Sequence, residues 1–151
     1  MSNTDALLSV HDLRKHFAVK GGLLSREVDR VHAVDGVSFD IDAGETLGLV
    51  GESGCGKSTT GRCILRLIEP SSGEILFKGV DVRKMDGTAL RALRRDMQII
   101  FQDPYASLNP RLTVGAIVGE ALTIHNLAKS RREHEDRVVQ LLETVGLSAE
   151  H

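Results

Sequence analysis

Apolar and polar residues alternate in the N-terminal part of the chain, which is the period of a β-strand. Residues 7–17 and residues 31–41 show this alternation, and the shorter run at residues 74–77 also predicts a strand. Between the first two, a glycine pair at residues 21–22 and several charged residues interrupt the pattern, which predicts a loop or a hairpin insertion. The N-terminal part is therefore expected to be rich in strands.

Two further apolar runs are continuous instead of alternating. Residues 46–50, Thr-Leu-Gly-Leu-Val, lie between turn residues and a glycine-rich stretch. A short run of this kind predicts a strand that is buried on both faces of a parallel sheet. Residues 97–101, Met-Gln-Ile-Ile-Phe, predict another apolar strand.

Helical spacing of apolar residues indicates the remaining elements. Residues 57–67 follow the glycine-rich stretch, and residues 86–95 form a short basic helix. Two more helices are expected near the C-terminus, with buried stripes at Val114, Ile117, Val118 and Ala121 and at Val138, Leu141, Leu142 and Val145. The last helix should begin at the capping box Ser130-Arg131-Arg132-Glu133 and end at Gly146.

Composition narrows the functional classes. The 151 residues suit one soluble domain with 41% hydrophobic and 26% charged residues, and no apolar run approaches the roughly 20 residues that span a bilayer. A net charge of −2 argues against a protein whose main partner is nucleic acid or an anionic membrane. No secretory signal pattern and only two cysteines favour a reduced cytoplasmic compartment. The six histidines show no metal-ligand spacing in the sequence.

Residues 51–58, Gly-Glu-Ser-Gly-Cys-Gly-Lys-Ser, match the Walker A pattern Gly-x4-Gly-Lys-Ser at every position. Glycines let the backbone fold tightly so that consecutive N–H groups point at phosphate, and the following helix adds the positive end of its dipole. Lys57 then supplies a charge for the β- and γ-phosphates, and the Ser58 hydroxyl can ligate Mg²⁺. The residues predicted to bind nucleotide are Gly51, Ser53, Gly54, Cys55, Gly56, Lys57, Ser58 and Thr59.

Cys55 lies inside this loop, next to the start of a helix. A helix N-terminus lowers the pKa of a thiol, so Cys55 could be a reactive cysteine. The simpler interpretation is a small residue that the loop tolerates.

A second motif separates this chain from other P-loop proteins. Residues 99–110, Ile-Ile-Phe-Gln-Asp-Pro-Tyr-Ala-Ser-Leu-Asn-Pro, place Gln102 at the end of an apolar strand. Together with residues 48–59, this stretch resembles the N-terminal half of an ATP-binding-cassette (ABC) nucleotide-binding domain. The resemblance is to the ATPase subunits of dipeptide, oligopeptide and nickel importers, and it covers residues 8–147.

The resemblance implies an α/β fold. It comprises a P-loop NTPase core that holds part of the ABC ATPase sheet and N-terminal antiparallel strands, followed by the start of a helical subdomain. The core would cover residues 1–112 and the helical part residues 113–151. The expected cofactors are ATP and Mg²⁺. By resemblance Gln102 is a catalytic residue that contacts Mg²⁺ or the attacking water. Phe17 is the candidate for stacking on adenine, with ordinary core packing as its alternative and His32 as a weaker candidate.

The implied function is that of the ATP-binding subunit of an importer of peptides or a related small solute, which couples ATP binding and hydrolysis to transport. Its partners would be transmembrane permease subunits and a second ATPase subunit, identical or different, without nucleic acid. It would lie peripherally on the cytoplasmic face of the inner membrane. The alternatives are a soluble ABC-type ATPase and a P-loop kinase or GTPase, although the guanine-reading Asn-Lys-x-Asp motif is absent.

Two motifs that this family needs for hydrolysis are not found. No apolar strand leads into Asp-Glu, and no Leu-Ser-Gly-Gly-Gln signature is present. We therefore expect a truncated chain in which residues 47–50 expose apolar surface, with poor stability and negligible ATP hydrolysis.

Overall fold

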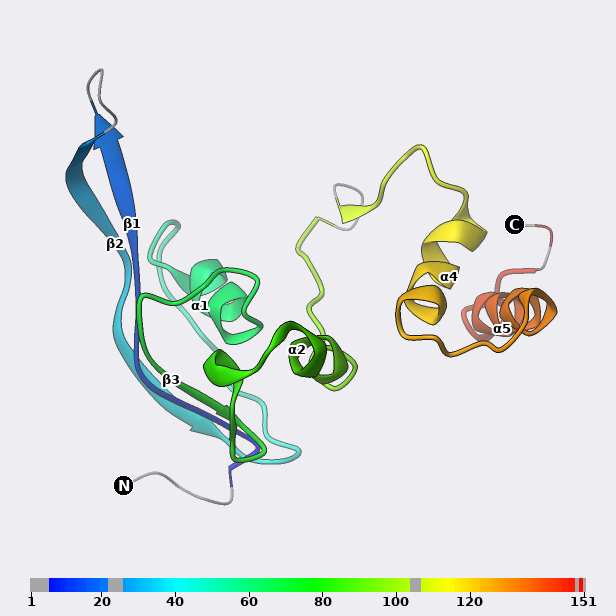
Figure 1. The fold of residues 1–151 in the computed structure, drawn as a ribbon, viewed down its shortest axis with the longest axis horizontal. Helices are drawn as coiled ribbons and strands as arrows, with labels where there is room; N and C mark the ends of the chain where they lie inside the picture. The colour runs from blue at the N-terminus through cyan, green and yellow to red at the C-terminus, as the bar shows by residue number, and fades with distance from the viewer. Residues whose placement is uncertain (1–5, 22–25, 104–106, 149, 151) are drawn as a thin grey trace. The chain divides into compact units, whose positions relative to one another are not determined.

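The computed structural model describes residues 6–21, 26–103, 107–148 and 150. The chain forms two units, Met1–Gln98 and Ile99–His151 (Figure 1), and each is described by itself. Two stretches singled out in the sequence fall partly outside the described residues. These are the expected loop after Gly21, at residues 22–25, and residues 104–106 of the second motif.

The first unit contains an antiparallel sheet with the strand order β2-β1-β3-β4. Its strands are β1 (Leu8–Gly21), β2 (Arg26–Ile41), β3 (Ser72–Phe77) and β4 (Val80–Asp81). The alternating patterns in the sequence thus correctly predict the first three strands. β1 and β2 pair along nearly their whole length, so the charged residues 26–29, which were expected in a loop, belong to β2.

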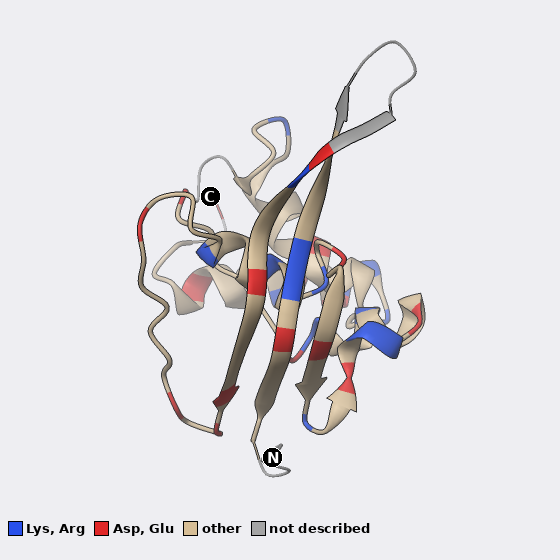
Figure 2. Ribbon diagram, turned by 90° about the vertical axis from the view of Figure 1, so that its left-hand side faces the viewer, with Lys and Arg blue, Asp and Glu red and all other residues tan. Residues whose placement is uncertain are grey.

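One side of this sheet is covered by helices. In the first unit, α1 (Lys57–Ile64) and α2 (Gly87–Leu93) lie on one face, and the other face is open (Figures 1 and 2). A short 3₁₀ turn at Val82–Lys84 follows β4. The buried core between the layers comprises Val10, Leu13, Val34, Cys63, Ile75, Phe77 and Val82. Burial raises the pKa of the Cys63 thiol, so this cysteine acts as a small apolar core residue.

The bulges at Gly36 and Ala33 determine which of residues 31–37 of β2 share a face. Along β1 the successive residues 13, 14, 15, 16 and 17 pair with residues 37, 35, 34, 32 and 31 of β2, so Gly36 and Ala33 are extra residues. In a regular strand, residues two apart have their side chains on the same face. Where a bulge adds one residue, residues three apart lie on the same face. Val31, Val34 and Val37 therefore share the helix-covered face, and His32 and Asp35 share the open face.

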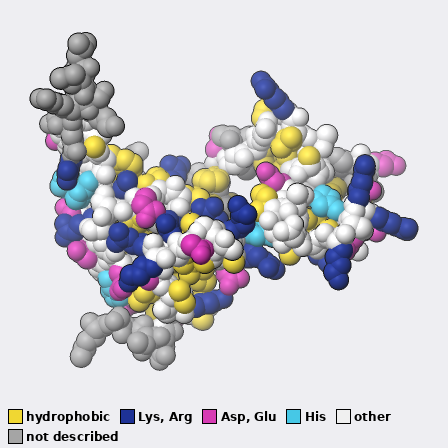
Figure 3. Space-filling view, in the orientation of Figure 1, with side chains coloured by type: hydrophobic (Ala, Val, Ile, Leu, Met, Phe, Trp, Pro, Cys, Tyr) yellow, Lys and Arg dark blue, Asp and Glu magenta, His cyan; other side chains and the backbone are white. Residues whose placement is uncertain are grey.

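Two predicted strands are absent. Residues 46–50 and 97–101 have no strand conformation. Val50 is 93% and Ile100 96% accessible, whereas Met97 and Ile99 are partly buried and Met97 packs against the core. A strand forms only against a hydrogen-bonded neighbour, and no described strand pairs with either run. The expected exposure of residues 47–50 is confirmed, and apolar side chains are visible on the surface of the molecule (Figure 3).

The second unit is a pair of helices, α4 (Val114–Ile124) and α5 (Arg131–Thr144). Their core is smaller than expected, because among the described residues of this unit the buried apolar side chains are Leu122, Val138 and Leu142, with Val118 and Leu127 packed against them. In the expected stripes, Val114, Ala121, Leu141 and Val145 are exposed. The cap of α5 is confirmed, since the Ser130 hydroxyl accepts a hydrogen bond from the Glu133 amide. The Glu133 carboxylate accepts from the Lys129 amide, one residue earlier than in a standard capping box.

The core of the first unit can be tested with two valines that lie two residues apart. Val82 is fully buried, and Val80 is 53% exposed. Val82→Ala should lower the free energy of unfolding by about 2 kcal/mol, because it removes buried methyl groups and leaves a cavity. Val80→Ala is the matched control and should cost less than about 0.5 kcal/mol. Urea unfolding followed by circular dichroism measures both, and equal losses would contradict the assigned core.

Candidate nucleotide-binding site

The glycine-rich loop connects the extended residues 45–50 to the N-terminus of α1. Within it, Gly54 has φ 87° and Gly56 has φ 97°, values that are unfavourable for any residue with a side chain. The loop is closed by a hydrogen bond from the Cys55 amide to the Glu52 carbonyl, 3.3 Å long. Residues at positive φ next to ordinary ones turn successive N–H groups toward one concavity, which is the geometry that binds anions.

A second constraint on this loop comes from β2. A Cβ placed on Gly56 would lie 2.1 Å from the Ala33 carbonyl oxygen and 3.6 Å from Cγ2 of Val34. No side chain fits at this position, because the first of these neighbours is backbone. The loop therefore lies directly against the bulge of β2, and Gly56 is required both for its backbone angle and for its missing side chain.

The Lys57 side chain folds back over the loop. Its ammonium donates to the carbonyl oxygens of Gly51 at 2.7 Å and Glu52 at 2.6 Å, and it lies 3.4 Å from the Cys55 sulfur. These contacts hold a positive charge at the mouth of the loop. A phosphate group bound by the loop amides would meet this charge.

The start of α1 differs from that of the other helices. Its N-cap, Gly56, has no side chain to accept a hydrogen bond. Among the described residues, the other α-helices are capped by the side chains of Asp86, Thr113 and Ser130. The first amides and the dipole of α1 are thus left for an external anion.

Three other predicted site residues line this region. Ser58 and Thr59 occupy the first turn of α1, and the Ser58 side chain is exposed and accessible to a metal ion. Cys55 is exposed, and its sulfur would lie 2.6 Å from a Cβ on Gly51. The loop glycine at this position therefore makes room for the Cys55 side chain.

Phe17 lies on the helix-covered face of the hairpin. Its β1 neighbour on that face, Lys15, pairs with Val34, donates to the Glu69 carbonyl at 2.9 Å, and lies 4.8 Å from the centre of the Phe17 ring. Phe17 is 40% exposed and is not part of the buried core cluster. His32 belongs to the opposite face, away from Val34 and the loop that Val34 contacts.

Gln102 belongs to the second unit and is exposed. It follows residues 97–101, which form no strand. The loop residues from Gly51 to Thr59 lie together in the first unit, whereas Gln102 lies in the second unit.

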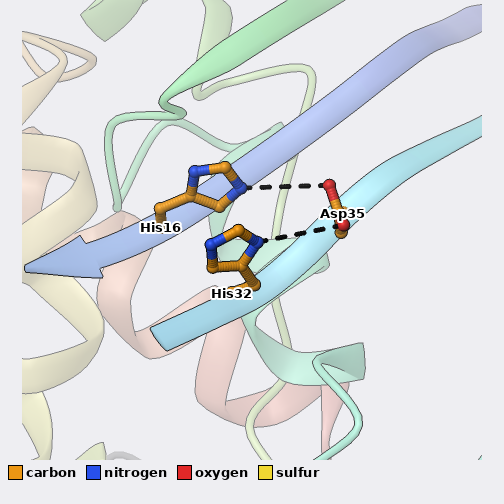
Figure 4. A group of neighbouring side chains, drawn as sticks. All are labelled: His16, His32 and Asp35. Atoms are coloured by element: carbon orange, nitrogen blue, oxygen red, sulfur yellow. Dashed lines mark ion pairs between the residues drawn. The ribbon is translucent and has the colours of Figure 1, made fainter. Parts of the chain in front are cut away.

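One group of metal-ligating residue types was not predicted from the sequence. His16, His32 and Asp35 lie together on the open face of the hairpin (Figure 4). Beside them Arg14 bonds to Asp12 and Asp35, and these carboxylates, Asp12 first, hold its pKa above the ordinary value. Sequence spacing gives no signal for this cluster, because a regular strand places residues three apart on opposite faces.

A glycine-rich loop that carries a lysine and leads into an uncapped helix N-terminus defines a P-loop nucleotide-binding protein. The family model described as "ABC transporter" matches residues 34–151, more than half of the chain. The chain belongs to the ABC transporter family, and membership of this family implies nucleotide binding.

Two curated relatives illustrate the similarity. The chain is 53% identical over 150 residues to the glutathione import ATP-binding protein GsiA of Pectobacterium atrosepticum, covering 99% of this chain and 24% of the relative. It is 55% identical over 149 residues to the oligopeptide transport ATP-binding protein OppF of Bacillus subtilis, covering 98% of this chain and 47% of the relative. The chain thus spans about a quarter to a half of the length of these relatives.

Solved structures show the same fold. The ATP-binding cassette MJ0796, in a dimeric post-hydrolysis state with ADP and Pi, matches with a TM-score of 0.71 and 27% identity, over 93% of this chain and 58% of that one. CbiO1 of Clostridium perfringens, part of the cbiONQ complex, matches with a TM-score of 0.66 and 28% identity, over 95% of this chain and 51% of that one. The α/β fold class and the family resemblance are therefore confirmed.

Helices long and apolar enough to cross a bilayer are not found among the described residues.

The contact between the loop and β2 can be tested with two glycines of the same segment. Gly56→Ala should weaken nucleotide binding at least tenfold and lower stability, because its Cβ would collide with the Ala33 carbonyl. Gly61→Ala, in α1 with open space around it, should leave binding unchanged and raise stability by up to about 1 kcal/mol. Titration with a fluorescent ATP analogue and thermal unfolding measure both effects. Normal binding by Gly56→Ala would contradict the assigned contact.

Proposed function

We propose that this chain is the ATP-binding part of an ABC importer for peptides or a related small solute, in which ATP binding and hydrolysis drive transport. The observation that carries the proposal is the structure of the loop. The Lys57 ammonium donates to the Gly51 carbonyl, and Gly56 packs against the Ala33 carbonyl of β2. The names of the relatives, which import oligopeptides or glutathione, support the substrate class.

The cofactors that fit this site are ATP and Mg²⁺. Phosphate oxygens would accept hydrogen bonds from the amides of the loop and the first turn of α1, at Gly51, Ser53–Gly56 and Lys57–Thr59. Lys57 would exchange its carbonyl partners for the β- and γ-phosphates, and the Ser58 hydroxyl would ligate Mg²⁺. Gln102 would complete the metal shell or orient the attacking water, as a catalytic residue.

Phe17 is the residue that we propose to stack on adenine. It lies on the same face of the hairpin as Val34, whose Cγ2 would be 3.6 Å from a Cβ on Gly56, and it is 40% exposed. His32, on the other face, is in a less suitable position.

The proposed partners are a second ATPase subunit and two permease subunits. Residues 1–112 would act as the ATP-binding core, and residues 113–151 would begin the helical subdomain that faces the permease. The protein would lie peripherally on the cytoplasmic face of the inner membrane. The alternative is a soluble ABC-type ATPase, and co-purification with the products of neighbouring permease genes separates the two.

ATP binding is tested by removing the charge at the loop. Lys57→Ala should weaken binding of a fluorescent ATP analogue at least tenfold, because hydrogen bonds to charged groups contribute about 1.5–3 kcal/mol. Lys84→Ala is the matched control, since Lys84 is 80% exposed and pairs with Asp81 on the surface. Equal affinity of the Lys57 variant and the unaltered chain would refute the proposal.

The role of Phe17 is tested by separating the base from the phosphates. Phe17→Ala should weaken ATP binding several-fold and leave binding of inorganic triphosphate unchanged, because only the adenine stack is lost. Phe17→Tyr should retain the affinity for ATP. If Phe17→Ala weakens both ligands equally, Phe17 acts through packing of the hairpin and not through the base.

A further inference from the structure

Two imidazoles and one carboxylate meet on the open face of the β1–β2 hairpin. One ligand atom each from His16, His32 and Asp35 lies within 4.8 Å of the others. Nε2 of His16 and Nδ1 of His32 each lie 3.9 Å from a carboxylate oxygen of Asp35 (Figure 4). The two rings are stacked, with centres 4.0 Å apart. One ligand atom of each group thus lies in the same small volume.

The backbone holds this convergence in place. His16 and His32 are direct cross-strand partners, so their side chains lie on the same face. The bulge at Ala33 then brings Asp35, three residues after His32, onto that face as well. The cluster is therefore built by the register of the hairpin and does not depend on a flexible loop.

Charged side chains surround the cluster. The Arg14 guanidinium donates to Asp35 Oδ1 at 2.6 Å and to Asp12 Oδ1 at 3.0 Å, so one positive charge faces two negative ones. Arg14, Asp12 and Asp35 together carry a net charge of −1, and Arg30 lies on the same face of β2, two residues before His32. Arg14 contacts Oδ1 of Asp35, and Oδ2, the oxygen on the His32 side, remains available.

An unsatisfied nitrogen points to a missing ligand. Among the described residues, Nε2 of His16 is buried and has no hydrogen-bond partner. A buried polar atom without a partner is costly, and a metal ion bound at this nitrogen would satisfy it.

The donor set selects the kind of metal. Imidazole nitrogen with carboxylate oxygen suits Zn²⁺ and similar transition-metal ions, whereas Mg²⁺ prefers oxygen ligands alone. Bonds of about 2.0–2.2 Å in a tetrahedral site place ligand atoms roughly 3.3 Å apart. The two 3.9 Å distances run to different oxygens of Asp35, so binding of one ion requires the side chains to move together and the stacked rings to turn toward each other.

We propose that His16, His32 and Asp35 bind one divalent transition-metal ion of the Zn²⁺ type, with water in the fourth position. The ion would link the two strands across the bulge. Because Ala33 lies between His32 and Asp35 and its carbonyl contacts Gly56, the bound ion would also fix the part of β2 on which the phosphate loop rests.

Zn²⁺ binding to the chain without an affinity tag tests this proposal. Calorimetric titration should give one equivalent, and Co²⁺ in its place should give the visible absorption of a tetrahedral nitrogen–oxygen site. His32→Gln and Asp35→Asn should each weaken Zn²⁺ binding at least tenfold. His125→Gln, in the second unit, is the control and should bind as the unaltered chain does.

Circular dichroism melts of each variant show that the substitutions leave the fold intact, which is expected because His32 and Asp35 are about half exposed. If a variant unfolds, the Co²⁺ spectrum of the unaltered chain still shows whether a tetrahedral metal site is present. No tetrahedral Co²⁺ spectrum, or equal Zn²⁺ affinity in His32→Gln and His125→Gln, would overturn the proposal.

Discussion

The phosphate loop rests on one backbone contact that only glycine permits. At Gly56 the chain passes so close to the Ala33 carbonyl that a Cβ would lie 2.1 Å from that oxygen. This contact sets the distance between the loop and the sheet, and the same residue takes the positive φ from which α1 begins. The proposed anion site, the start of α1 and the contact with β2 thus all depend on the absence of a side chain at Gly56.

The bulge at Ala33 gives the hairpin two faces of different chemistry. On the helix-covered face, Val34 contacts the loop and Phe17 lies farther along the same side. On the open face, the same bulge aligns His32 with Asp35 and opposite His16. A change at Ala33 would therefore alter the support of the loop and the histidine cluster together.

The sequence was sufficient for the local features of this fold. The alternating runs predict β1, β2 and β3, and the spacing of glycine, lysine and serine in residues 51–58 predicts the loop, because these depend on neighbours in the chain. The resemblance of residues 48–59 and 99–110 to importer ATPases correctly predicts the family.

Features that depend on distant partners could not be predicted in this way. Residues 46–50 and 97–101 read as strands, yet they form none here because no described strand pairs with them. The histidine cluster was missed for a related reason. Regular strand periodicity separates His32 from Asp35, and only the pairing register shows the bulge that brings them together.

The central claim is that ATP binds at the loop through backbone amides whose position depends on β2. Amide chemical-shift changes on titration of isotopically labelled chain with Mg²⁺-ATP test it most directly. We expect the largest shifts at residues 53–58, with a second group at Ala33 and Val34, the β2 residues nearest to Gly56. Shifts that leave residues 53–58 unchanged, or no saturable response to ATP, would contradict it.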